Sequence, residues 1–140
     1  MAAKYFVDTN ILIYAHDSSM GVKYQRAHKL LEQLWATGEG VLSTQVLQEL
    51  CVNLRRKALV PFSVDEMTAL IRDYLSWQVV VNTPESVLRA LEIEQRHKIS
   101  FWDALILQAA ESAGADVVYS EDLSAGQSYA GIRVVNPLVK

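Results

Sequence analysis

Four acidic residues of this chain stand beside or inside apolar segments, where a charged side chain is costly to place. They are Asp8, Glu49, Asp103 and Asp122. Asp8 directly follows the apolar run 5–7, and Asp103 interrupts the apolar run 101–107. A divalent cation held by converging carboxylates would compensate such charges. The four acids therefore indicate a hard-metal site and the phosphate chemistry that such sites commonly perform.

The elements that must position these acids alternate between strands and helices. Continuous β-branched or apolar runs predict strands at 4–7, 41–42, 79–81, 117–119 and 133–135. Helical spacing and capping signals predict helices at 11–16, 22–36, 44–57, 64–77, 84–97 and 100–114. This alternation predicts one α/β domain over residues 1–140, with a mostly parallel central sheet flanked by helices.

The predicted elements bring the acids toward one edge of the sheet. Asp8 falls at the carboxyl end of the first strand, and Asp122 falls just beyond the carboxyl end of a later one. Asp103 lies in the first turn of a helix, and Glu49 lies one to two turns into another. Ligands bind at the carboxyl ends of parallel strands, so we expect the four to converge there. Like charges brought together must bind cations or take up protons, and an all-carboxylate set suits Mg²⁺ or Mn²⁺.

Each acid also has an interpretation that involves no metal. Asp103 follows Ser100 by three residues, the spacing of a helix capping box. Glu49 taken alone fits a solvated helix position, and Asp122 fits a turn. Asp8 is the hardest to explain in this way, because it follows a buried strand directly. The four acids together favour the metal site over these separate explanations.

Composition restricts the class of protein. The chain has 140 residues, 51% of them hydrophobic, and a formal net charge of −3. This charge argues against a protein that coats nucleic acid, but it permits an enzyme that cuts it at an acidic pocket. The sequence contains no apolar run long enough to span a membrane, and its first residues lack a signal-peptide core. The single cysteine, Cys51, fits a reducing compartment, so we expect a cytoplasmic protein.

At this point the motifs resemble those of a known family. Residues 7–12 read Val-Asp-Thr-Asn-Ile-Leu, residues 101–106 read Phe-Trp-Asp-Ala-Leu-Ile, and residues 120–123 read Ser-Glu-Asp-Leu. Together with Glu49 on a mid-chain helix, they resemble the PIN-domain ribonucleases in order and over essentially the whole chain. The likeness is greatest to the VapC-type toxins of VapBC toxin–antitoxin systems. It implies a PIN-like α/β/α sandwich.

The resemblance also implies an activity, a cofactor and partners. It implies an endoribonuclease that depends on Mg²⁺ or Mn²⁺, with Asp8, Glu49, Asp103 and Asp122 as the metal-holding quartet. Thr9, Asn10 and Ser120 would support that site. Glu121 stands beside Asp122, and which of the two points inward stays open. The family further implies a homodimer and a cognate antitoxin protein.

Other readings of the sequence compete with this one. The triplet Arg55, Arg56 and Lys57 is a weak candidate for RNA binding, because positive charge at a helix C-terminus is also favoured by the helix dipole. A dehalogenase-type phosphatase would need an acid where Asn10 stands, and a receiver domain would need a lysine after the strand 117–119. A catalytically inert PIN-like module that binds protein or RNA remains the alternative from another class. Four intact acids argue against it.

Overall fold

The computed structural model describes residues 3–123, 128–129 and 131–139. Six strands form one sheet in the order β3-β2-β1-β4-β6-β5, and all neighbours are parallel except β5 and β6. The strands are β1 (Tyr5–Val7), β2 (Gly40–Ser43), β3 (Gln78–Val80), β4 (Val117–Tyr119), β5 (Ser128–Tyr129) and β6 (Ile132–Val135). The predicted mostly parallel sheet is thereby confirmed. Sequence reasoning missed β5, which has only two residues and pairs antiparallel at the edge of the sheet.

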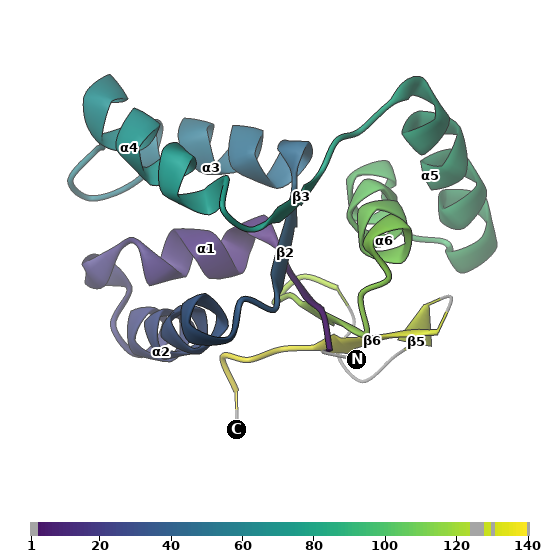
Figure 1. The fold of residues 1–140 in the computed structure, drawn as a ribbon, viewed down its shortest axis with the longest axis horizontal. Helices are drawn as coiled ribbons and strands as arrows, with labels where there is room; N and C mark the ends of the chain where they lie inside the picture. Colours follow the sequence, from purple (N-terminus) through teal and green to yellow (C-terminus); the bar gives the residue numbers. More distant parts are fainter. Residues whose placement is uncertain (1–2, 124–127, 130, 140) are drawn as a thin grey trace.

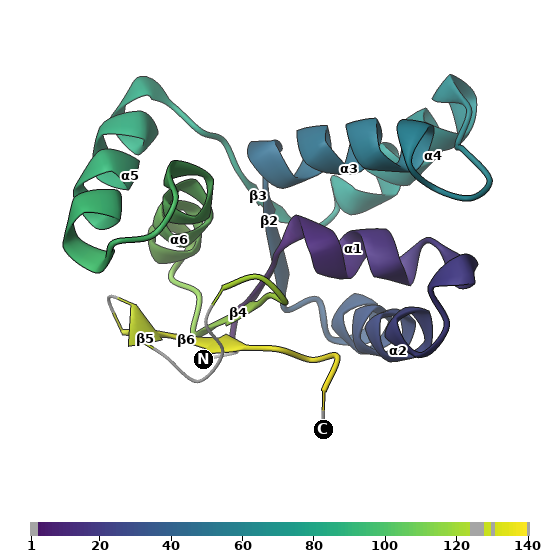
Figure 2. The ribbon, with the colours of Figure 1, turned by 180° about the vertical axis from the view of Figure 1, so that it is seen from behind.

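Helices cover both faces of this sheet. They are α1 (Thr9–Ala15), α2 (Val22–Thr37), α3 (Thr44–Arg56), α4 (Val64–Tyr74), α5 (Pro84–His97) and α6 (Phe101–Ala113), with a 3₁₀ turn η1 at Ser18–Met20. Helix α5 packs on α6, and α1 packs on α2 and α3. Figures 1 and 2 show α5 and α6 together on one side of the strands and α1 with α2 on the other. The result is the expected α/β/α sandwich.

Capping residues fix where the helices begin. Ser43 caps α3 by accepting a hydrogen bond from the backbone N–H of Val46. Ser63 opens α4 in the capping box that the sequence predicts. Thr83 caps α5 as predicted, and also forms a reciprocal capping box that the sequence analysis did not predict. These three caps fix the residues at which α3, α4 and α5 begin. Ser43 is also the last residue of β2, so the chain there passes directly from strand to helix.

Helix α4 is shorter than predicted. It ends at Tyr74 rather than near Trp77, and the backbone N–H of Trp77 bonds to the carbonyl of Tyr74 in a tight turn. The Trp77 ring then lies so close to Gly40 that a side chain there would collide with it. Trp77, Tyr74 and Trp35 form one aromatic cluster with ring centroids 5.1–5.2 Å apart. Burial of this cluster overrides the helical pattern of the sequence.

The core lies on both faces of β1 and against α6. Phe6, Val7 and Val118 are fully buried or nearly so, and every residue from 104 to 110 on α6 is buried. This agrees with the prediction that α6 is too apolar to lie on the surface. None of the described helices combines the length and apolarity needed to cross a membrane.

Candidate active site

The centre of the candidate site is the junction where β1 and β4 end side by side. Val7 and Tyr119 are register partners in these parallel strands, so the next residues, Asp8 and Ser120, leave the sheet together. The Ser120 hydroxyl donates a 2.8 Å hydrogen bond to Oδ2 of Asp8. The other carboxylate oxygen of Asp8 accepts a 2.7 Å bond from the backbone N–H of Thr9 and caps α1. Asp8 is thus 7% exposed and held from two sides.

All four predicted acids line one pocket at this edge of the sheet. Its volume is about 300 Å³. Asp8 comes from the end of β1, Glu49 from α3, Asp103 from the first turn of α6, and Asp122 from the segment after β4. Four segments that are distant in sequence therefore meet as the topology predicts. Their roles in metal binding or catalysis stay predictions.

Neutral side chains fix the orientation of two of these carboxylates. The Thr9 hydroxyl donates a 2.7 Å bond to Oε1 of Glu49. The Asn10 amide nitrogen donates a 2.9 Å bond to Oδ2 of Asp122, while its oxygen accepts the backbone N–H of Glu121. The short polar residues after Asp8 thus brace acids from two other segments. Thr9, Asn10 and Ser120 all lie where supporting residues were predicted.

The charges of the pocket influence one another. Burial raises the pKa of Asp8 from 3.8 to about 6, hydrogen bonds from Ser120 and Thr9 oppose that rise, and the charges of Asp103 and Glu49 add to it. Burial also raises the pKa of Asp103, and the nearby charge of Asp122 pushes it in the same direction. Asp8 and Asp103 therefore lie in surroundings that disfavour their ionised forms.

The structure separates the two candidates for the fourth acid. Asp122 lines the pocket, whereas the carboxylate of Glu121 forms a 2.7 Å ion pair with Lys23 and accepts a 2.5 Å hydrogen bond from the Tyr14 hydroxyl. Glu121 thus forms an ion pair outside the pocket. In the described part of the chain the carboxylate of Asp122 forms no ion pair, and it accepts a hydrogen bond from the neutral amide of Asn10.

The donors of the pocket fit a hard divalent cation in type. They are the carboxylates of Asp8, Glu49, Asp103 and Asp122, and carboxylate ligands suit Mg²⁺ or Mn²⁺. Within residues 3–123, 128–129 and 131–139, no three His, Cys, Asp or Glu side chains lie close enough together to enclose an ion.

The capping interpretation of Asp103 accounts for only half of its environment. Its backbone N–H donates to the Ser100 hydroxyl, which caps α6. Ser100 and Asp103 do not form the reciprocal capping box that the sequence also allows, although a hydrogen bond with the Ser100 side chain lowers the pKa of Asp103 against the effect of burial. Asp103 also lines the pocket.

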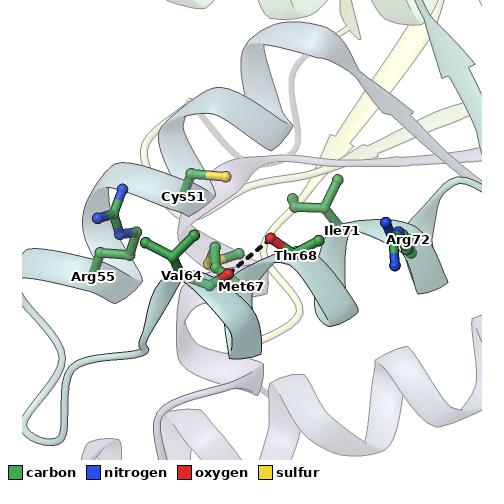
Figure 3. Close-up of a pocket in the computed structure, with 7 residues that line it drawn as sticks. All are labelled: Cys51, Arg55, Val64, Met67, Thr68, Ile71 and Arg72. Atoms are coloured by element: carbon green, nitrogen blue, oxygen red, sulfur yellow. Dashed lines mark hydrogen bonds between the residues drawn. The ribbon is translucent and has the colours of Figure 1, made fainter.

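The basic triplet lies away from the acids. Arg55 and Arg56 occupy the last turn of α3 and Lys57 caps it, as the dipole interpretation predicts. Arg55 lines a second pocket of about 280 Å³ between α3 and α4, with Cys51 and the apolar side chains of α4. Figure 3 shows Cys51 and Arg55 on α3 facing the side chains of α4. Burial raises the pKa of Cys51, which argues against a thiolate nucleophile there.

Sequence reasoning missed several residues of the acidic pocket. Gln45 and Asn53 line it from α3, and Trp102 lines it from α6. Gln45 and Asn53 stand four residues before and after Glu49, so helical spacing places all three on one face of α3. That spacing is the signal that would have identified them.

Comparisons with known proteins agree with this architecture. A family model described as PIN domain matches residues 5–126. The Mycobacterium tuberculosis toxin VapC20, described as cleaving the sarcin–ricin loop, shares 23% identity with a TM-score of 0.67, over 86% of this chain and 91% of its own. A Klebsiella pneumoniae toxin–antitoxin complex shares 19% with a TM-score of 0.70, over 97% and 98%. A DNA-bound VapBC complex from Salmonella typhimurium shares 22% with a TM-score of 0.64, over 95% and 97%.

At these identities the solved structures show a shared fold. No curated protein matches the chain.

Proposed function

Because this chain belongs to the PIN domain family, we propose that it is an endoribonuclease dependent on Mg²⁺ or Mn²⁺ and the toxin of a type II toxin–antitoxin pair. One observation carries the proposal: carboxylates from four separate segments line a single pocket at the carboxyl edge of the parallel sheet. A protein that only binds a partner gains nothing from such a repulsive arrangement. A phosphodiesterase needs it to hold cations.

The side chains divide into two roles in this proposal. Asp8, Glu49, Asp103 and Asp122 hold the ion, which when bound activates water and stabilises the leaving oxygen of the phosphodiester. Thr9, Asn10 and Ser120 keep three of these carboxylates oriented through the hydrogen bonds already described. Asp122 rather than Glu121 is the fourth acid, because Glu121 is engaged by Lys23 and Tyr14.

The proposed partners are RNA as substrate, a second copy of this chain, and an antitoxin protein. The likeness to structures described as toxin–antitoxin and VapBC complexes supports the antitoxin. The unpaired Cys51 supports a cytoplasmic location. Sedimentation of the purified chain, alone and with the product of an adjacent gene, tests both protein partners.

The cleavage test uses a labelled RNA pool and the purified protein in Mg²⁺ or Mn²⁺. Parallel reactions contain EDTA, the Asp8→Asn variant, and Asp65→Asn as a matched control. Asp65 is an exposed aspartate in the first turn of α4, away from the pocket. We expect cleavage that requires both the metal and Asp8 but not Asp65.

Calorimetry with Mn²⁺ distinguishes the ways in which this test can fail. Binding of Mn²⁺ without cleavage of any RNA tried would contradict the nuclease activity but retain the metal site. Neither binding nor cleavage would contradict both, and would favour an inert PIN-like module that binds protein or RNA.

A further inference from the structure

Trp102 is a large aromatic residue at the edge of the acidic pocket. It lines this pocket next to Asp103, and its side chain is 63% exposed. The other two tryptophans of the chain pack into the aromatic cluster with Tyr74. A large apolar ring left open beside a polar pocket indicates a surface that a ligand covers.

We propose that Trp102 is a stacking platform for an unpaired base of the nucleic acid whose phosphate enters the carboxylate pocket. The inference rests on the proposed function and assigns to Trp102 the contact with the base beside the cleaved phosphodiester. Bases within a duplex are covered by their neighbours, so only an unstacked base can lie on an indole.

The indole has one aromatic neighbour among the described residues. The ring of Phe101, half-buried against the core, meets it edge-on with centroids 5.5 Å apart and planes at 75°. The Gln45 amide donates a 3.4 Å bond to the backbone carbonyl of Trp102, and so contacts the main chain rather than the ring.

The charge of the pocket favours a neutral contact. Four carboxylates line it, and none of its described lining residues is Lys, Arg or His. The described pocket therefore offers the phosphodiester no positive side chain, and contacts to the bases would add to what a bound cation contributes. Aromatic stacking contributes about 1–3 kcal/mol per base and tolerates any base.

The test measures binding in the Asp8→Asn background, so that RNA is not cut, with Mn²⁺ present. Fluorescence anisotropy follows a short, labelled, single-stranded RNA of mixed sequence. Trp102→Ala is expected to weaken binding about 5- to 150-fold, and Trp102→Phe is expected to lose less. Leu88→Ala is the matched control, because Leu88 is also 63% exposed and lies on α5 outside the pocket lining.

Two further readouts separate stacking from disturbance of Asp103. In proteins that retain Asp8, the affinity for Mn²⁺ should be the same with and without Trp102→Ala. An abasic residue moved along the RNA should weaken binding to the parent at one position and leave Trp102→Ala unaffected there. A matching duplex should bind equally weakly to both proteins.

The outcomes distinguish this inference from the proposed function. If the wild-type protein cleaves RNA but Trp102→Ala binds the single strand as tightly as its parent, the stacking inference is wrong and the nuclease stands. The stacking inference would also be wrong if an abasic residue at every position weakened RNA binding by the same factor in Trp102→Ala and in its parent. If the wild-type protein neither binds nor cleaves RNA, both fall together.

Discussion

The hydroxyl of Thr9 donates a 2.7 Å hydrogen bond to Oε1 of Glu49, across 40 positions of sequence. Thr9 is the first residue of α1, and Glu49 lies in the middle of α3. The backbone N–H of Thr9 also donates a hydrogen bond to the carboxylate of Asp8. One residue therefore orients two carboxylates of the pocket, one through its main chain and one through its side chain.

Thr9→Val should weaken binding of Mn²⁺ by about 10- to 100-fold, the usual effect of removing a partner that orients a metal-binding side chain. Valine keeps the shape and β-branching of threonine and leaves the backbone bond to Asp8 intact. Thr9→Ser retains the hydroxyl and serves as the control, with an affinity close to that of the wild type. Calorimetry with Mn²⁺ measures both, and an unchanged affinity in Thr9→Val would contradict an orienting role.

Asp8→Asn should abolish cleavage and stabilise the metal-free protein. The pKa of Asp8 is raised from 3.8 to about 6, so folding is opposed by its ionisation. That cost is absent below pH 4, grows as the pH rises through 6, and is complete above it. Its upper value is about 3 kcal/mol. Weaker hydrogen bonds of an amide to Thr9 and Ser120 change the stability of Asp8→Asn by the same amount at every pH.

We therefore expect the free energy of unfolding of Asp8→Asn, relative to the wild type, to rise by up to about 3 kcal/mol between pH 4 and pH 7.5. Urea denaturation in EDTA at both pH values measures the difference. Asp103→Asn should change stability in the same direction, because burial raises the pKa of Asp103 too. A loss of stability in both variants at pH 7.5 would show that these carboxylates serve the fold rather than a metal.

Local signals allowed much of this arrangement to be predicted. The caps at Ser63, Thr83 and Ser100 and the strand at 117–119 are where short-range chemistry places them. The convergence of the four acids followed from one topological rule, that parallel strands share a carboxyl edge.

Long-range packing accounts for what the sequence did not predict. The partner of Glu121 is Lys23, almost a hundred residues earlier, and neither residue carries a local sign of the other. The early end of α4 depends on Trp77 packing over Gly40, which only the folded chain brings together. The exposure of Trp102 was equally hidden, because its apolar neighbours in sequence are buried or half-buried.

The neighbouring acids Glu121 and Asp122 should respond differently to neutralisation. Asp122→Asn is expected to lower the affinity for Mn²⁺ and the rate of cleavage about tenfold or more, since Asp122 lines the pocket. Glu121→Gln should leave the affinity for Mn²⁺ within about twofold, because its carboxylate is paired with Lys23 and Tyr14. Parallel titrations of the two variants decide the assignment, and the reverse order of effects would make Glu121 the fourth acid.

His16 should make the fold sensitive to acid. Burial, with a smaller contribution from His28, lowers the pKa of His16 from 6.5 to about 4, and its Nε2 lies 2.6 Å from the Tyr74 hydroxyl. The unfolded chain then binds a proton that the folded chain does not. The neutral imidazole therefore leaves stability complete above pH 6.5, and stability falls as the pH decreases toward 4. The full loss is about 3 kcal/mol.

Acidification over an overlapping pH range removes the cost of burying ionised Asp8 and so raises the free energy of unfolding. In the wild type this partly cancels the loss of stability caused by His16. The measurement is therefore made in the Asp8→Asn background, by urea denaturation from pH 7.5 to 4.5. The parent should lose stability steeply on acidification, and His16→Gln, which has no titrating ring but retains a polar group for Tyr74, should lose about 2 kcal/mol less across this range. Equal slopes in the two proteins would mean that His16 takes up its proton as readily when folded as when unfolded.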